Sequence, residues 1–206
     1  MKKINLSFLL ILSLQLTSCL SGSDYYRDRI EPFLKDLKPN YKPQVYDGVM
    51  EPEEFPDLIE DQKTLEGIDS NKDGVRDDLE IFINRNFNTW IERDNLKNTV
   101  RRAPEFYKKY KTMTVRELII HSSNYSVDKN CIWSGLRRLN LKSSPELLRY
   151  NALDAIYNTK NRESAYNYNY QRLAGEAYGD GYGDSKIMDK CSEKIDNELK
   201  KKNGSN

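Results

Sequence analysis

Hydrophobic residues recur along most of this chain at intervals of three and four, which is the spacing of one face of an α-helix. The clearest such face carries Leu79, Phe82, Ile83, Phe87, Trp90 and Ile91. Alternating strand patterns and repeats of solenoid length are both absent from the sequence. The pattern therefore predicts an all-α fold, a small bundle of about six helices.

Capping residues divide the middle of the predicted bundle into separate helices. Pro104 marks a restart, and Thr114 with Glu117 forms a capping box for a helix over residues 115–124. Ser126 is expected to cap the next helix. The sequence thus predicts a break between two helices in this region.

Further start signals follow toward the C-terminus. Residues 144–146 read Ser-Pro-Glu, a strong helix start with proline at the first helical position. Two more apolar faces follow, one of them around Tyr166 and the other from Ile187 to Leu199. We expect the folded domain to cover residues 57–199 and the basic residues 200–206 to form a disordered tail.

The segment before residue 57 is rich in proline. Five of the seven prolines lie between Pro32 and Pro56. One short amphipathic helix around Ile30 is indicated, and Pro32 limits it. We therefore expect residues 19–56 to be mostly an extended tether, part of which wraps the domain.

The N-terminus has the features of a secretory signal. Two lysines precede an apolar run that is too short to span a bilayer, and Leu-Thr-Ser-Cys follows at residues 16–19. This tetrad resembles the lipobox of bacterial lipoproteins, which implies cleavage after residue 18 and a lipid on Cys19 that anchors the chain. Leu20 in place of Asp matches the outer-membrane sorting pattern of enteric lipoproteins. The alternative is an ordinary secreted protein with a chance cysteine.

The cysteine count fits this interpretation. If Cys19 carries lipid, Cys131 and Cys191 remain in an oxidising compartment, where a disulfide is the default. In the chain-entropy model this bond stabilises the fold by about 4 kcal/mol. The alternative is a pair of buried free thiols.

The strongest internal motif spans residues 69–80. Its spacing places oxygen donors where the twelve-residue EF-hand loop has them, with Gly74 at the sharp turn. The expected Ca²⁺ ligands are Asp69, Asn71, Asp73, Val75 through its carbonyl, Asp77 and Glu80. The loop and the helix after it resemble the EF-hand superfamily.

Two residues depart from a paired EF-hand. Gly67 interrupts the incoming helix, and Arg76 occupies loop position 8, where paired loops usually carry an apolar residue. We therefore expect a single loop that holds a structural Ca²⁺, as in extracellular bacterial proteins. Residues 67–78 also resemble a segment of uncharacterised bacterial envelope proteins, and that resemblance implies no activity.

Charge is divided unevenly along the chain. Residues 24–80 contain 17 acidic and 8 basic residues, whereas residues 81–206 contain 15 acidic and 23 basic residues. The net charge of +1 for the whole chain argues against a nucleic-acid binder. The asymmetry indicates either mutual attraction of the two halves or an interaction surface.

Few residues suggest catalysis. His121 is the single histidine and has no nucleophile motif near it, so we interpret it as structural. Half of the 14 tyrosines lie between Tyr150 and Tyr182, in core positions or on an interaction face. We expect a non-enzymatic, calcium-binding envelope lipoprotein that binds an envelope protein or polymer. The alternatives are an immunity or inhibitor lipoprotein against a periplasmic toxin and an envelope glycan hydrolase.

Overall fold

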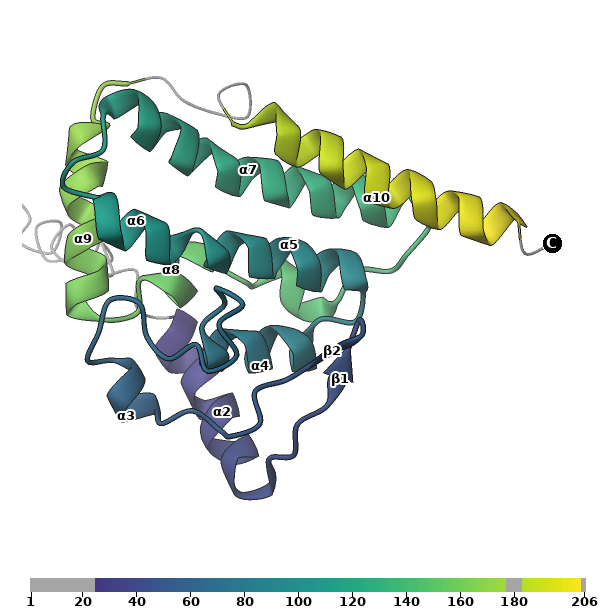
Figure 1. Cartoon of the computed structure of the whole chain (residues 1–206), viewed down its shortest axis with the longest axis horizontal. Coiled ribbons are helices and arrows are strands. Elements are labelled where there is room, and N and C mark those ends of the chain that lie inside the picture. Colours follow the sequence, from purple (N-terminus) through teal and green to yellow (C-terminus); the bar gives the residue numbers. More distant parts are fainter. Residues whose placement is uncertain (1–24, 177–182, 205–206) are drawn as a thin grey trace, which may run out of the picture.

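Helix α7 (Val115–Arg138) is the longest helix in the described residues and packs against both α5 (Trp90–Arg101) and α10 (Ser185–Gly204), which Figure 1 labels. The computed structural model describes residues 25–176 and 183–204. On the other side of α5 lies α4 (Asp77–Asn86), followed by α2 (Glu31–Leu37). The predicted all-α class is confirmed, because the described residues are mostly helical and surround one hydrophobic core.

The N-terminal segment belongs to this core, which corrects the expected tether. A π-helical turn (Tyr26–Ile30) runs directly into α2 and buries Tyr26, Ile30 and Leu34. Pro32 does not end this helical run, because it directly follows the π-helical turn, whose wider hydrogen bonding, from the Glu31 N–H to the Tyr26 carbonyl, accommodates a residue without an N–H. Residues 25–37 are therefore part of the domain.

The rest of the front segment is less regular. After a 3₁₀ turn (Lys38–Asn40), β1 (Val45–Tyr46) pairs antiparallel with β2 (Val49–Met50) through a turn in which Asp47 and Gly48 have positive φ. The short helix α3 (Leu58–Asp61) follows, with its N-terminus capped by the Asp57 side chain.

Three short helices complete the body. They are α6 (Ala103–Lys109), α8 (Ala152–Ile156) and α9 (Lys160–Arg172), and α9 covers one end of the bundle in Figure 1. The predicted start at residues 144–146 gives only a 3₁₀ turn (Pro145–Leu148). The helix expected there is therefore shorter than predicted and begins later, at α8.

Two helix boundaries differ from the sequence prediction. The capping box of Thr114 and Glu117 is present, but α7 runs through Ser126 without the expected break. At the C-terminus α10 continues past Lys200 to Gly204, so the backbone of the expected tail is helical where it is described. Lysine and glutamate favour helix, and Lys201 pairs with Glu198 one turn earlier (2.6 Å).

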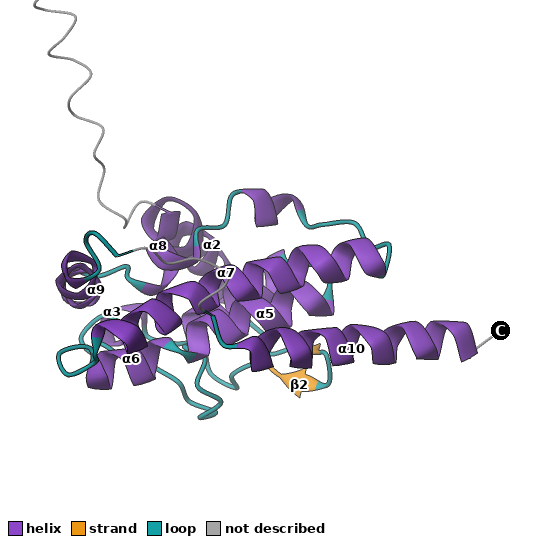
Figure 2. Cartoon of the chain, turned by 90° about the horizontal axis from the view of Figure 1, so that it is seen from above, coloured by secondary structure: helices purple, strands orange, loops and turns teal. Residues whose placement is uncertain are grey.

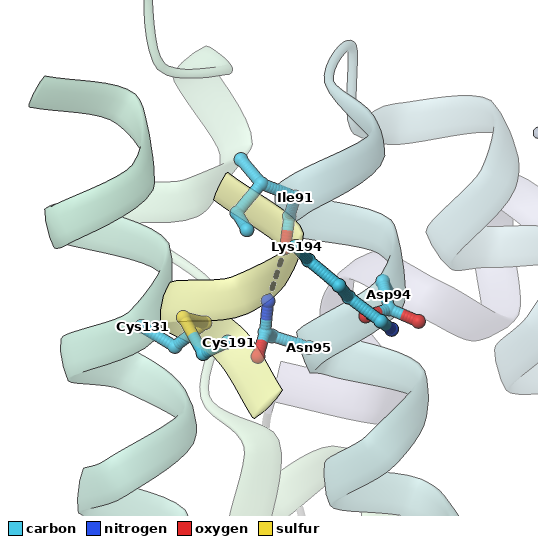
Figure 3. Close-up of a disulfide and its surroundings, with 6 residues drawn as sticks. All are labelled: Ile91, Asp94, Asn95, Cys131, Cys191 and Lys194. Atoms are coloured by element: carbon cyan, nitrogen blue, oxygen red, sulfur yellow. Dashed lines mark hydrogen bonds and ion pairs between the residues drawn. A yellow bond between two sulfur atoms is a disulfide. The ribbon is translucent and has the colours of Figure 1, made fainter. Parts of the chain in front are cut away.

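A disulfide between Cys131 on α7 and Cys191 on α10 joins the two helices, with their Cα atoms 6.0 Å apart. Close by, Lys194 of α10 donates to Asp94 of α5 (2.6 Å), as Figure 3 shows. These contacts hold the first part of α10 on the bundle, and Figure 2 shows its C-terminal part extending beyond the body. None of the helices in the described ranges is long and apolar enough to cross a membrane.

Candidate metal centre

The backbone of the predicted calcium loop is folded around two of its carboxylates. Asp69 accepts hydrogen bonds from the backbone N–H groups of Asp73 (3.1 Å) and Gly74 (2.9 Å). Asp73 in turn accepts from the N–H of Val75 (2.8 Å). Gly74 has φ +84°, a conformation that L side chains rarely adopt, so the glycine is required at this turn.

The last four residues of the loop, 77–80, form the first turn of α4. The N–H of Asp77 bonds the carbonyl of Ile68 (2.8 Å), and the Asp77 carboxylate accepts from the N–H of Ser70 (3.1 Å). Glu80 is fully buried and accepts from the side-chain amide of Asn71 (3.3 Å). The structure therefore places loop positions 9 and 12 on a helix, as the motif predicts.

Two basic side chains of α5 contact the expected ligands. Lys97 donates from Nζ to Glu80 Oε1 (2.8 Å), and Arg101 donates from Nη2 to Asp73 Oδ2 (3.0 Å). Lys97 and Arg101 lie one turn apart on the same helix face. The sequence motif gave no sign of them, because both lie outside the loop on a different helix.

The donor chemistry of the loop fits Ca²⁺, since all the expected ligands are hard oxygens. The side chains are nevertheless not gathered around one point. No group of three or more histidine, cysteine, aspartate or glutamate side chains in the described residues is placed to hold a metal ion. Two of the expected ligands, Glu80 and Asp73, instead pair with Lys97 and Arg101. The backbone turn is in place, whereas the ligand side chains are apart.

Burial makes ionisation of Asp77 and Glu80 less favourable. It raises the pKa of Asp77 to about 6, and the charges of Asp69 and Glu80 add to the effect, while hydrogen bonds from Ser70 oppose it. Burial also raises the pKa of Glu80, and Lys97 opposes that shift. The hydrogen bonds from Ser70 and the charge of Lys97 offset only part of the cost of burying these charged carboxylates. A cation placed among the oxygens would offset more of it.

Arg76, at loop position 8, points into the core instead of toward a partner loop. It is buried and forms a two-pronged pair with Asp78 (2.7 and 2.9 Å). It also donates to the backbone carbonyls of Ala155 and Ile156 at the end of α8 (3.3 Å each). The residue that breaks the EF-hand pattern thus fastens the loop to the bundle.

A second buried arginine completes this network. Arg162 of α9 is fully buried and bonds both the carboxylate (3.2 Å) and the carbonyl (2.6 Å) of Asp61 at the end of α3. Asp61 Oδ2 also lies 3.5 Å from Arg76 Nε. A Cβ on Gly67 would lie 2.3 Å from Arg76, so the glycine before the loop makes room for the network. We call Asp61, Arg76, Asp78 and Arg162 the arginine network.

The incoming helix of an EF-hand is short here. Helix α3 ends at Asp61, and irregular chain leads from there to the loop. Arg162 bonds carbonyls of this connection at Thr64 (3.1 Å) and Leu65 (3.0 Å). The resemblance to the EF-hand superfamily therefore does not extend to the incoming helix.

The remaining predicted residues lie away from the loop. Cys19, the expected lipid anchor, lies outside the described residues. His121 stacks on Phe106 with ring centroids 4.7 Å apart, and its Nε2 lies 3.1 Å from the hydroxyl of Tyr125. His121 is thus packed among aromatic rings.

The tyrosine-rich segment is divided between core and surface. Tyr157 is buried, whereas Tyr168 and Tyr170 on α9 are 47% and 54% exposed. Tyr178 and Tyr182 lie outside the described residues.

Comparisons with known proteins add no further assignment. No family model, curated protein sequence or solved structure matches this chain. The sequence motifs and the geometry described above therefore carry the functional argument.

Proposed function

We propose that this protein is a calcium-binding envelope lipoprotein in which the ion has a structural role. Cys19 carries the lipid anchor, and the loop at residues 69–80 binds the ion. The observation that carries the proposal is the folded loop backbone, with Asp69 accepting two loop N–H groups and Glu80 buried at the start of α4.

The position of the loop supports a structural role. It connects the region around α3 to α4, and α4 contributes Leu79, Phe82 and Ile83 to the core. Bound Ca²⁺ would supply positive charge and coordination to the loop oxygens. Modules of this kind outside the cytoplasm bind at about 10⁻⁴–10⁻³ M, where binding to the native state alone adds stability.

Glu80 has the most demanding role in this proposal. The last position of the loop offers both carboxylate oxygens to the ion, and Lys97 holds one of them in the structure. Lys97 therefore acts as a counter-ion built into the protein, which has to leave Glu80 Oε1 when the loop is loaded. Because Lys97 also lines an open cavity, its ammonium group has space to move into.

The exposed part of α9 supports a role in binding an envelope protein or polymer. Tyr168 and Tyr170 present large amphipathic rings to solvent, and Arg172 lies over the ring of Tyr168 (5.8 Å). Rigid aromatic side chains of this kind are favoured at binding surfaces.

The alternative of a glycan hydrolase finds less support. Acids line the cavity of about 380 Å³ beside the loop, but each of them forms an ion pair with a neighbouring base. The pairs are Asp47 with Arg93, Asp73 with Arg101, Asp94 with Lys194, and Glu198 with Lys201. This arrangement favours binding over acid–base chemistry at that cavity. No observation of the structure bears on the immunity or inhibitor alternative.

Isothermal titration of the purified chain with Ca²⁺ tests the ion site. We expect one site in the wild type, its loss in Glu80→Gln, and its retention in Glu60→Gln, which alters an exposed glutamate on α3. The absence of binding heat from the wild type would overturn the loop assignment.

Metabolic labelling tests the anchor separately. Radiolabelled palmitate should enter the wild-type protein and fail to enter Cys19→Ala. Label that persists in Cys19→Ala would contradict the anchor.

A further inference from the structure

A second cavity lies between α5, α7 and the segment that leads into α8. Its volume is about 480 Å³, within the range of pockets that bind small molecules. None of the expected calcium ligands borders it. The lining residues are Leu96, Thr99, Tyr125, Ser126, Asp128, Lys129, Ile132, Trp133, Leu147, Leu148, Tyr150, Asn151, Ala152 and Leu153.

Much of the wall is apolar, and two large apolar side chains in it reach solvent. Trp133 is 40% exposed and Leu148 is 77% exposed. They lie on opposite walls, since Trp133 belongs to α7 and Leu148 to the 3₁₀ turn before α8. Exposed apolar side chains at the edge of a hollow are typical of a binding site rather than of plain surface.

Two polar side chains in the wall have oxygens without a hydrogen-bond partner. The Asp128 carboxylate accepts from the hydroxyl of Thr99 (2.7 Å) and pairs with Arg102, both through Oδ2. Its other oxygen, Oδ1, is buried and has no hydrogen-bond partner in the structure. The hydroxyl of Tyr150 is buried and unpartnered as well. Unpaired buried oxygens are costly, and a ligand that bonds them removes that cost.

The charges around the cavity favour an uncharged ligand. Arg102 neutralises Asp128, and Lys129 adds one positive charge to the lining. The positive charge of Lys129 would repel a cationic ligand. Asp128 Oδ1 is free to accept a hydrogen bond and would repel an anion. A hydroxyl or amide group supplies the donor without a net charge.

We propose that this cavity binds a small uncharged molecule with an apolar body and a hydroxyl or amide group that donates a hydrogen bond to Asp128 Oδ1. The apolar body lies against Leu96, Ile132 and Trp133. Because Asp128 Oδ1 and the Tyr150 hydroxyl are shielded from solvent, binding includes an outward shift of the wall at residues 147–153. This assignment is independent of the calcium loop.

Phenol and toluene provide a matched pair of probes, because they have the same ring and only phenol has a hydrogen-bond donor. The chain has two tryptophans, so indole N–H resonances in NMR spectra report separately on Trp133 in the cavity and Trp90 outside it. We expect phenol to shift the Trp133 resonance and leave Trp90 in place. We also expect phenol to bind about tenfold more tightly than toluene.

Filling the cavity provides the second test. Ala152 is only partly buried at the start of α8, so Ala152→Phe should fold and weaken phenol binding at least about tenfold. Ala174→Phe, at an exposed position outside the cavity, is the matched control and should bind as the wild type does. The proposal is overturned if phenol leaves Trp133 unshifted, if toluene binds as tightly as phenol, or if a folded Ala152→Phe binds phenol normally.

Discussion

Two acid-rich regions lie side by side in residues 61–80, and their carboxylates are neutralised in different ways. In the arginine network, Asp61 and Asp78 are held by Arg76 and Arg162 deep in the core. In the predicted calcium loop, Glu80 and Asp73 contact Lys97 and Arg101 of α5, and both bases line an open cavity. One region is closed by two buried guanidinium groups, and in the other we propose that calcium supplies further positive charge.

The pKa directions reproduce this difference only for Asp78. Burial would raise the pKa of Asp78, but the Arg76 guanidinium beside it holds that pKa below its usual value. In the loop, burial raises the pKa of both Asp77 and Glu80 despite the opposing contacts. Asp61 of the network behaves differently, because burial and the charge of Asp78 raise its pKa while Arg76 and Arg162 oppose that shift. Asp78 is therefore the one acid of the two regions whose charged form is clearly favoured, and the contrast between the regions rests on geometry.

The largest expected effect comes from breaking the arginine network. Arg162→Met removes the partner that bonds both the carboxylate and the carbonyl of Asp61, and it leaves several carbonyls unpaired. We expect a loss of about 3–5 kcal/mol in the free energy of unfolding, measured by denaturant titration in saturating calcium. Lys63→Met, which breaks an exposed pair with Glu60, is the control and should change little. Equal stability of Arg162→Met and the wild type would remove the distinction between the regions.

His121 extends the comparison to a packed titratable group whose pKa the negative charge of Glu105 raises less than burial and Arg102 lower it. Burial, and then the positive charge of Arg102, lowers its pKa from 6.5 to about 4. The folded protein therefore favours the neutral ring, and this contribution is lost as pH falls from 6.5 toward 4. We expect about 3 kcal/mol from this source, read as the difference between wild type and His121→Gln in denaturant titrations at both pH values. Parallel stability curves for the two proteins would contradict it.

A smaller effect is expected where the network meets the N-terminal helical segment. The hydroxyl of Tyr26 donates to Asp78 (2.7 Å), so Tyr26→Phe removes one hydrogen bond to a buried carboxylate. We expect a loss of about 1–2 kcal/mol in the free energy of unfolding. The control is Tyr46→Phe, whose hydroxyl bonds Gln44 at the surface. A similar small change in both variants would show that the Asp78 contact adds no stability.

The smallest expected effect separates the loop from the network. Lys97→Met removes the built-in counter-ion of Glu80, so calcium no longer competes with an ammonium group. We expect calcium affinity to rise about five- to tenfold, measured by isothermal titration, while stability without calcium falls. Lys194→Met, which loses a pair with Asp94 outside the loop, should leave the affinity unchanged. Unchanged affinity in Lys97→Met would show that Lys97 does not compete with the ion.

The parts predictable from sequence are those set by neighbours in the chain. The capping box at Thr114 and Glu117 and the start of α4 after Gly74 depend on residues a few positions apart. The helical class follows from the spacing of apolar residues. Capping residues and apolar spacing thus predict the helical class, these helix starts and the position of the turn in the loop.

The missed parts depend on distant residues. Arg162 and Asp61 are separated by 101 positions, so nothing local marks them as partners. The front segment resembled a tether because of its prolines, yet Ile30 and Leu34 are buried by helices much later in the chain. The expected break in α7 disappears because Ser126 is tolerated within a helix held on both sides by α5 and α10. Tertiary packing decided each of these cases.

The most direct test of the central claim is the unfolding temperature of the intact chain, measured in about 10 mM calcium and again with a chelator. A structural ion in the loop predicts that calcium raises this temperature by about 3–10 °C in the wild type. Glu80→Gln should show no such rise. An unfolding temperature of the wild type that is the same with calcium and with chelator would contradict the account.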